Sequence, residues 1–393
     1  MLKVKMYPAG NGDAFLISSE GVNILVDGGY AQTFDKHISD DLHDLSSRGE
    51  HLDLLITTHI DADHISGIIR LLSLNGSSDS PKIVPIGNIW HNSLRSLTAK
   101  VDMKAQPSDQ EVLNAVLRRG RPATANDVAE ISARQGNSLA SLIHQGKYLW
   151  NGGDGATRIS VESIPVFTLP DGCVNLLAPT QKRLDSLLKW WKKELRRLGY
   201  EGPFGAGDVI DDAFEFMCEY SGKSTVTKPV EISANRFIDL EDMYEPDASP
   251  TNGSSIATII ELGGARVLML ADAWAEDIVQ ALRDLKSQGT SMIFDAIKIS
   301  HHGSSRNTSP ELLQLVDAPK YIVSSNGKKH GHPDIEVLAA IVDRSAPFPR
   351  TIYLNYPTPA AEYIRSYQSK SGTAFTVYDN ATNWIEIKES TNK

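Results

Sequence analysis

The sequence is poor in cysteine and has no long apolar run. Its 393 residues include only two cysteines, Cys173 and Cys218, so disulfides are not the framework of the fold. No uninterrupted apolar stretch approaches the ~20 residues that a membrane-spanning helix needs. The opening residues 1–6 (MLKVKM) lack the apolar core of a signal peptide and alternate as a strand does. We therefore expect a cytoplasmic protein that does not act at a membrane.

The chain also lacks an excess of basic residues. It has 39 lysines and arginines against 49 aspartates and glutamates, which gives a formal net charge of −10. This balance disfavours a protein wrapped in nucleic acid by its overall charge. A metal-dependent hydrolase carries many carboxylates, however, so local charged patches indicate more about its substrate than the net charge does. The apolar content of 41% is typical of a globular protein with a sizeable core.

One stretch concentrates potential metal ligands. Residues 52–57 form an apolar run typical of a buried strand, and isoleucines and leucines recur at helical spacing after residue 64. The turn between them reads His59-x-Asp61-x-Asp63-His64. A polar turn with one helix-capping aspartate explains one carboxylate, but not the second aspartate and the two histidines. Because imidazole and carboxylate both donate lone pairs to divalent cations, this stretch predicts a metal site.

Other candidate ligands also follow predicted strands. Asp27, Asp272 and the pair His301 and His302 each end an apolar, β-branched run. Asp27 precedes two glycines, and a role in holding a turn is an equal alternative for it. His91 follows another short strand, where a hydrogen-bonded structural histidine and a ligand are both reasonable interpretations. Since sites in α/β proteins form at the carboxyl ends of strands, the shared position predicts one common site.

Two segments are predicted to be helical insertions in a single domain. The first covers about 93–147, and the second covers 179–251, where a Gly-, Pro- and Asp-rich stretch from 200 to 250 is predicted as a long loop or lid. The remaining residues alternate between strands and helices. They would form the core of one domain over residues 1–393, made of 1–92, 148–178 and 252–393.

The second insertion begins with a strongly basic helix from Gln181 to Leu198. Leucines and a tryptophan form one apolar face, and lysines and arginines fill the remainder. A solvated face on a packed helix is the more common explanation of such a pattern. The alternative is a surface that follows the phosphates of a nucleic acid, with Trp190 available for base stacking.

The motifs resemble those of the metallo-β-lactamase superfamily. The stretch His59-x-Asp61-x-Asp63-His64 is similar to the signature His-x-His-x-Asp-His, with Asp61 in place of the second histidine. That departure is typical of one branch, the nuclease-like domain of the DNA-uptake channel protein ComEC and its soluble relatives. The resemblance covers residues 1–90 and 252–390. The other stretches that carry it are 11–14 (NGDA), 24–27 (ILVD), 268–272 (LMLAD), 298–304 (KISHHGS) and 331–333 (GHP).

The resemblance implies an α/β fold, an αββα metallo-β-lactamase sandwich with a central helical insertion and a site at one edge of two facing sheets. It also implies two divalent metal ions. His59 and Asp61 would hold one ion, and Asp63 and His64 would help to hold the other, with Asp272 bridging them. Replacement of a histidine by Asp61 makes the site harder, so Mn²⁺ competes with Zn²⁺.

Two ligand assignments are less direct. The second ion would take one histidine of the 301–302 pair, and His301 is favoured over His302 because it lies nearer the strand end. The third-motif histidine of the superfamily has no clear match in this sequence. His91 is the candidate for that position.

The function implied by the resemblance is a metal-dependent hydrolase, most consistent with a phosphodiesterase or nuclease that acts on DNA or RNA. Asp63 would orient the attacking water, while His302, His332 or Ser304 would stabilise the phosphate or protonate the leaving oxygen. One alternative is a hydrolase of small esters, cyclic nucleotides or lactones, which the acidic charge and the lid-like segment favour. Another is a non-catalytic metal-binding module whose helical insertion binds a protein partner.

Overall fold

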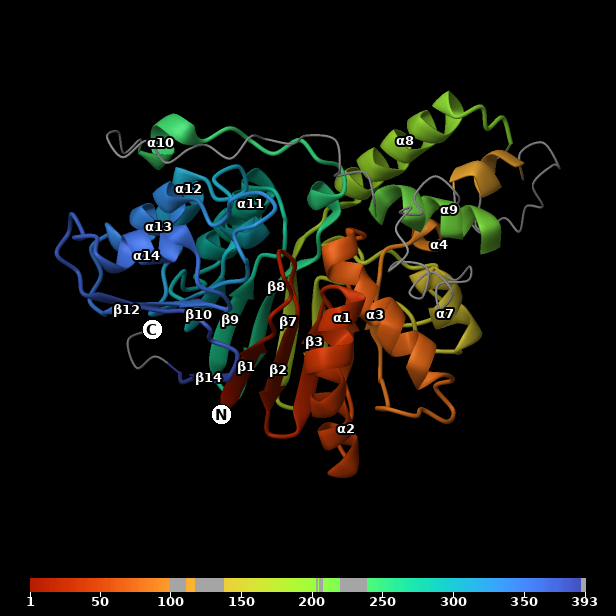
Figure 1. Cartoon of the computed structure of the whole chain (residues 1–393), viewed down its shortest axis with the longest axis horizontal. Coiled ribbons are helices and arrows are strands. Elements are labelled where there is room, and N and C mark those ends of the chain that lie inside the picture. Colours follow the sequence, from red (N-terminus) through yellow and green to blue (C-terminus); the bar gives the residue numbers. More distant parts are fainter. Residues whose placement is uncertain (99–110, 117–137, 203, 205–207, 220–238, 390–393) are drawn as a thin grey trace.

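The computed structural model describes residues 1–98, 111–116, 138–202, 204, 208–219 and 239–389. In this part of the chain the strands form two sheets that face each other (Figure 1). The six-stranded sheet has the order β14 (Trp384–Ile387), β1 (Leu2–Met6), β2 (Phe15–Ser19), β3 (Val22–Val26), β4 (Leu54–Ile56) and β5 (Ile89–Trp90). The eight-stranded sheet has the order β13 (Phe375–Tyr378), β12 (Arg350–Leu354), β11 (Lys320–Val323), β10 (Ala296–Lys298), β9 (Ala265–Met269), β8 (Ala257–Leu262), β7 (Gly172–Ala178) and β6 (Val166–Leu169).

Both sheets are mixed, and their parallel parts position the site. Strands β3, β4 and β5 are parallel to one another, and strands β9 to β13 form a second parallel set. The remaining pairings are antiparallel. Since parallel strands end at the same edge, the residues that follow β3, β4, β9 and β10 come together at one end of the sandwich.

Apolar side chains fill three successive layers. In β4, Leu54 and Ile56 belong to the cluster between the sheets, whereas Leu55 points to the helices on the outer face. The same alternation occurs in β3, where Ile24 lies between the sheets and Leu25 lies under the helices. A third cluster joins the eight-stranded sheet to its own helices. Because these strands are buried on both faces, their sequences are continuous apolar runs. The predicted αββα sandwich is confirmed.

The helices cover the two outer faces. The six-stranded sheet is covered by α1 (Ala31–Thr33), the π-helical turn η1 (Phe34–Ile38), α2 (Ser39–Ser47) and α3 (Ala62–Asn75). The eight-stranded sheet is covered by α11 (Ala275–Ser287), α12 (Pro310–Leu315), α13 (Ile335–Val342) and α14 (Pro359–Arg365). None of the helices in the described ranges is long and apolar enough to cross a membrane.

The inserted segments contain more helices, drawn on the right of Figure 1. They are α4 (Leu94–Leu97), the helical residues 111–116, α7 (Leu139–Gln145), α8 (Gln181–Arg197) and α9 (Asp208–Glu219), while the short helix α10 (Leu240–Met243) lies beside α13. The basic helix predicted from Gln181 is confirmed as α8. The prediction of a loop over 200–250 is wrong at α9, because an apolar face with Phe214 and Cys218 packs into the core. The parts of both insertions at 99–110, 117–137 and 220–238 lie outside the described residues.

A buried ion-pair network holds one end of the eight-stranded sheet. Arg350 at the start of β12 has a side chain with no exposed surface and donates from Nε and Nη2 to Asp317, at 3.0 and 2.5 Å. Tyr321 and Arg344 also donate to Asp317 Oδ1. Burial alone would raise the pKa of the Asp317 carboxyl, but the hydrogen bond from Arg350 and the charges of Arg344 and Arg350 hold it below its ordinary value.

We expect Asp317→Asn to destabilise the protein by about 3–5 kcal/mol, because it leaves the Arg350 charge buried without its partner. The difference in free energy of unfolding should have its full size above pH ~4, the pKa of an unfolded aspartate. It should shrink as the pH falls through the lower pKa of the folded state. Urea unfolding of both proteins between pH 3 and pH 7 measures this difference.

The control is Asp379→Asn, which breaks the exposed pair between Asp379 and Arg365. A surface pair of this kind contributes about 1 kcal/mol or less. Equal losses in the two variants, or a loss in Asp317→Asn that grows as the pH falls, would contradict the role assigned to this network.

Candidate metal centre

The carboxylate of Asp272 is the point at which four histidines converge. Its Oδ2 lies 3.8 Å from Nε2 of His59 and 3.6 Å from Nε2 of His64, His301 and His302. Asp272 follows β9, where the preceding Ala271 has a left-handed backbone with φ of 48°. The two sheets contribute two histidines each, because His59 and His64 follow β4 whereas the other pair follows β10. These candidate ligands, which the sequence places at the ends of different strands, thus lie together in the structure.

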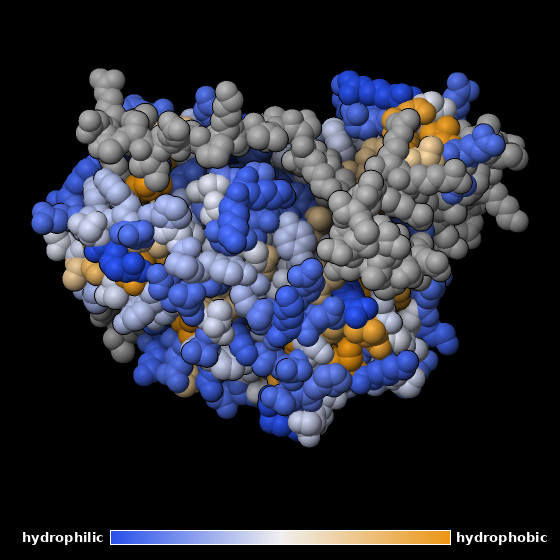
Figure 2. Space-filling view, in the orientation of Figure 1, coloured by the Kyte–Doolittle hydropathy of each residue, from blue (hydrophilic) through white to orange (hydrophobic). Residues whose placement is uncertain are grey.

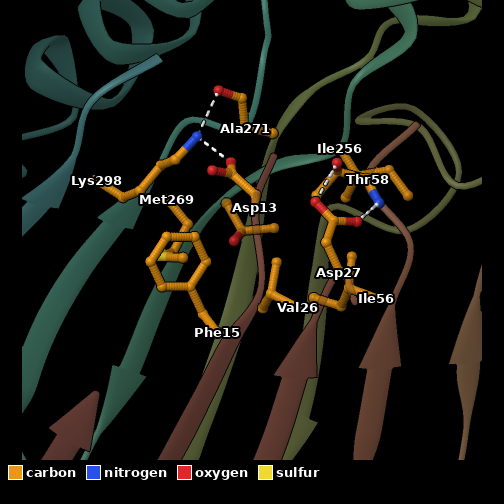
Figure 3. Close-up of a pocket in the computed structure, with 11 residues that line it drawn as sticks. Asp13, Phe15, Val26, Asp27, Ile56, Thr58, Ile256, Met269, Ala271 and Lys298 are labelled. Atoms are coloured by element: carbon orange, nitrogen blue, oxygen red, sulfur yellow. Dashed lines mark hydrogen bonds and ion pairs between the residues drawn. The ribbon is translucent and has the colours of Figure 1, made fainter. Parts of the chain in front are cut away.

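Hydrogen bonds orient the two histidines of the six-stranded sheet. The buried carboxylate of Asp27 accepts the backbone N–H and the hydroxyl of Thr58 at 2.8 and 2.7 Å (Figure 3). Its Oδ2 also accepts from Nδ1 of His64 at 2.8 Å. The Thr58 hydroxyl lies 3.1 Å from Nδ1 of His59, and it accepts from that nitrogen since its own proton goes to Asp27. Both imidazoles therefore carry their proton on Nδ1 and direct the Nε2 lone pair to the centre.

The histidines of the eight-stranded sheet are oriented in the same way. Nδ1 of His301 donates to Oδ1 of Asn307 at 2.6 Å, and Nδ1 of His302 donates to the backbone oxygen of Ser324 at 2.9 Å. Asn307 is held in turn, because its Nδ2 donates to Oδ2 of Asp247 at 3.0 Å and to the backbone oxygen of Asp272 at 3.1 Å. Each Nε2 is left free to face Asp272, as in a histidine that binds a metal.

The cluster contains buried polar atoms without a partner. Nε2 of His59, Nε2 of His64 and Oδ1 of both Asp61 and Asp272 are shielded from solvent and make no hydrogen bond. Unpaired buried acceptors are costly, and here they are lone pairs that point into one space. Three of these residues, His59, His64 and Asp272, also form a group whose ligand atoms all lie within 4.8 Å of one another. The donor set therefore fits divalent cations.

The electrostatics of the cluster favour positive charge. Burial alone would raise the pKa of the Asp272 carboxyl, but His301, His302 and His64 hold the pKa well below its ordinary range. For His64, burial alone would lower the pKa, but Asp272 and Asp27 outweigh burial and raise the pKa well above its ordinary value. The two shifts are two sides of one interaction, because the negative Asp272 carboxylate and the positive form of the imidazoles around it stabilise each other.

A buried ion pair lies directly beneath the centre. Lys298 and Asp13 are fully buried, and the ammonium group contacts Oδ2 of Asp13 and donates to the backbone oxygen of Ala271 at 3.1 Å (Figure 3). Nζ also lies 3.9 Å from Oδ1 of Asp272. The lysine thus holds the left-handed turn before Asp272 and balances part of the local negative charge. These residues line a small cavity between the two sheets.

Asp63 lies at the start of α3 and contacts the first loop of the chain. Asn11 donates from Nδ2 to Oδ2 of Asp63, and the hydroxyl of Tyr30 donates to Oδ1 of Asn11 at 3.0 Å. A Cβ at Gly12 would lie 1.8 Å from the backbone oxygen of Asp63, so only glycine fits this close approach. The first loop therefore fixes Asp63 by contacts that the sequence motif alone does not reveal.

A histidine- and lysine-containing loop lies over the His301 side of the centre. The ring centroid of His332 is 5.7 Å from that of His301 and 6.0 Å from that of His330. Nδ1 of His332 pairs with Oδ1 of Asp334 at 3.0 Å, which leaves Nε2 available to a substrate. The exposed Lys329 is close enough to Asp63 to help lower the pKa of that carboxyl against the effect of burial. Lys329 therefore supplies positive charge to the rim on this side, whereas burial lowers the pKa values of His330 and His332.

The predicted site residues fall into three groups. His59, Asp61, Asp63, His64, Asp272, His301 and His302 lie together. Among the described residues, His302 belongs to two compact ligand groups, one with Asp63 and His64 and one with Asp13 and Asp272, whereas His301 belongs to none. His302, which the sequence analysis assigned to the substrate, is therefore at least as well placed to bind a metal as His301. His332 lies at the rim.

Two other predicted residues are not brought to the centre. Nε2 of His91 lies 2.7 Å from Oε1 of Glu215 on α9, and its ring stacks on Trp150. His91 thus links β5 to the inserted helices and is absent from the ligand groups found in the described residues. Ser304 is buried, and its hydroxyl accepts the backbone N–H of Arg306. It shapes the turn after the histidine pair, and its predicted role toward a substrate stays a prediction.

Sequence reasoning missed Asp13, Lys298 and Asn307. Asp13 and Lys298 lie inside two of the motifs that carry the family resemblance. Nothing in either motif indicates that a turn aspartate and a lysine so far apart in the chain form an ion pair. Asn307 lies six residues after His301 and becomes an orienting residue only because the chain turns back there.

Part of the chain matches a known protein family. Residues 7–76 match the family model described as "Metallo-beta-lactamase superfamily". No curated protein matches the chain. Among solved structures, CmlA from Streptomyces venezuelae, a diiron beta-hydroxylase, is similar with 12% identity and a TM-score of 0.38 over 96% of this chain and 53% of CmlA. Zn²⁺-bound PqqB from Methylobacterium extorquens is similar with 13% identity and a TM-score of 0.37 over 98% of this chain and 100% of PqqB. This chain thus spans about half the length of CmlA.

We expect Asp27→Asn to weaken binding of the divalent ions about 10- to 100-fold, because a neutral amide no longer fixes the His64 tautomer or increases its basicity. Competition against a chromophoric chelator measures this affinity. The matched control is Asp53→Asn at the other end of β4, where the carboxylate accepts the backbone N–H of Asn23 at 2.8 Å. Equal metal affinity in both variants would contradict the orienting role of Asp27.

Proposed function

We propose that this chain, a member of the metallo-β-lactamase superfamily, is a metal-dependent hydrolase that cleaves phosphodiester bonds. The observation that carries the proposal is the convergence of four oriented imidazoles on one buried carboxylate, with lone pairs left unpaired at the centre. When bound, a pair of divalent ions supplies Lewis-acid activation of water and positive charge for the phosphate oxygens. Zn²⁺ and Mn²⁺ both suit a donor set of imidazoles and carboxylates.

The residues at one side of the centre would hold the first ion. His59 and Asp61 are neighbours, with 3.7 Å between Nε2 and Oδ2, and Asp272 lies beside them. The remaining ligands would be Asp63, His64 and a histidine of the 301–302 pair, with Asp272 between the two groups. Asp61 is partly exposed, with 20% of its side chain accessible, so this side is open to solvent and substrate.

The rim would bind and orient an anionic substrate. Lys329 and His330 are exposed beside Asp63 and His332, and an ammonium group near the carboxylates favours a phosphate over a neutral ester. His332, held by Asp334 through Nδ1, presents Nε2 to the leaving oxygen and can exchange a proton there. Asp63, held by Asn11, can accept a proton from the water that attacks.

The same residues support a place in the ComEC-like branch of the superfamily. Asp61 stands where the general signature has a histidine, and the 298–304 stretch carries the two adjacent histidines of that branch. In this branch a nuclease is the natural activity, so DNA and RNA are the substrates to test first.

We expect the metal-loaded protein to hydrolyse bis(p-nitrophenyl) phosphate and labelled DNA or RNA. Asp272→Asn should reduce the rate by about 10³-fold or more, because loss of the shared carboxylate removes several kcal/mol of transition-state stabilisation. The matched control is the exposed Asp79→Asn, and melting temperatures verify folding. Full activity of Asp272→Asn would exclude a mechanism based on this centre. If the protein hydrolyses lactones or neutral esters but no phosphodiester, the proposed phosphodiesterase activity is wrong and the alternative of a small-molecule hydrolase takes its place.

We expect Lys329→Ala to raise KM for a phosphodiester about three- to five-fold and to change kcat by less than about two-fold, because an exposed ammonium group contributes mainly to binding. Lys286→Ala on α11, an exposed lysine in another part of the surface, is the control. A loss confined to kcat, or equal effects in both variants, would exclude substrate binding by Lys329.

A further inference from the structure

Helix α8 carries a straight row of lysines on its outward face. Its inward face is formed by Leu184, Leu187, Trp191 and Leu195, which are buried in the core. Lys182, Lys189 and Lys193 are exposed and are separated by seven and then four residues. Spacings of two turns and one turn place side chains above one another on one side of a helix. The three ammonium groups therefore form a line along α8.

Within the described part of the chain, the lysines of this row have no acidic partner. No described residue forms an ion pair or hydrogen bond with the side chains of Lys182, Lys189 or Lys193, although other cations of α8 are paired. Arg183 pairs with Asp277, and Arg197 pairs with Glu194. An unpaired row of positive charge is unexpected on a protein with a net charge of −10. In Figure 2 the upper right of the molecule, where α8 lies, shows hydrophilic residues beside a hydrophobic patch.

The first turn of α8 is anchored next to the metal centre. Arg183 donates from Nε and Nη2 to Asp277 at 2.6 and 2.8 Å, and its guanidinium carbon lies 4.1 Å from the ring centroid of Trp274. Trp274 is two residues after Asp272. The helix also contacts the short turn η3 (Asn252–Ser254), and the chain after this turn donates from Ile256 N to Thr58 O at 2.9 Å. The row of lysines therefore begins near the centre and runs away from it (Figure 1).

We propose that the outward face of α8 is a nucleic-acid-binding surface, which holds the phosphate backbone of a strand whose scissile bond lies at the metal centre. The proposal rests on the proposed phosphodiesterase function and identifies a polymer as its substrate. Because a helix rises 1.5 Å per residue, Lys182 and Lys193 are about 16 Å apart along the axis, which corresponds to about five phosphates per strand along the axis of a duplex. Exposed lysines contact phosphate oxygens without reading bases, so binding is independent of sequence.

Trp190, which the sequence analysis offered for base stacking, is partly buried. It packs against the core cluster beneath the helix, whereas the lysines of the row are exposed. The surface is therefore electrostatic, and its affinity depends on salt through the release of counterions.

The experiment compares two triple variants of the metal-loaded full chain. The first replaces Lys182, Lys189 and Lys193 by glutamine, and the control replaces the exposed Lys36, Lys82 and Lys286, which form no ion pair with described residues, by glutamine. Both change the net charge equally. Fluorescence anisotropy with a labelled 20-nucleotide single strand of DNA, and with its RNA counterpart, measures affinity between 50 and 300 mM salt. Hydrolysis of bis(p-nitrophenyl) phosphate reports on the centre itself.

We expect the α8 variant to bind both strands on the order of 100-fold more weakly at 0.1 M salt, with a salt slope lower by about 2, because each lost phosphate contact forfeits about 0.7 released counterions. The control should stay within about three-fold, and hydrolysis of the small ester should be equal in all three proteins. Equal losses in the two variants, or no loss in either, would overturn the proposal. If the native protein hydrolyses no phosphodiester, the proposed function fails, while the comparison of binding and salt slope still decides whether α8 binds nucleic acid.

Discussion

Buried negative charge is the constraint on which the functional end of this protein depends. The carboxylates of Asp13, Asp27, Asp63 and Asp272 are all buried around one point, and Lys298 is the lysine buried with them in the described chain. Such an excess is unfavourable in a low-dielectric interior unless positive charge is supplied. Histidines can supply it by taking up protons, and divalent cations can supply it more compactly. Metal binding and the stability of this end of the sandwich are thus expected to be coupled.

The centre also connects the two sheets. Asp13 of the first sheet's loop pairs with Lys298 at the end of β10, and the hydroxyl of Ser324 donates to the backbone oxygen of Gly12 at 2.6 Å. On the same edge, Asn355 donates to the backbone oxygen of Tyr7 at 3.0 Å. Between the sheets the packing is apolar and non-directional, whereas these polar contacts fix the relative position of the ligands. Ligands from two sheets therefore keep a common geometry.

The helical insertions are joined to the sandwich by a few buried or partly buried polar contacts. Glu215 of α9 accepts from His91 and from the backbone N–H groups of Leu139 and Ala140, so one carboxylate joins β5, α7 and α9. Helix α8 is joined to the other sheet's helices through Arg183 and Asp277. An insertion held in this way can present a surface in a constant position relative to the centre. This is what a substrate longer than the centre itself requires.

The sequence by itself determined the alternation of strands and helices, the strand-to-helix turn with His59 and His64, and the basic helix α8, whereas the layered sandwich was implied by the family resemblance. These features depend on local periodicity and on the spacing of residues within one segment, which neighbouring residues largely decide. Only the tertiary structure decided that His302 lies among the candidate ligands, that His91 pairs with Glu215, and that a helix occupies 208–219. The reason is that each of these depends on contacts between residues far apart in the chain, and residue type alone does not specify which partner will be near.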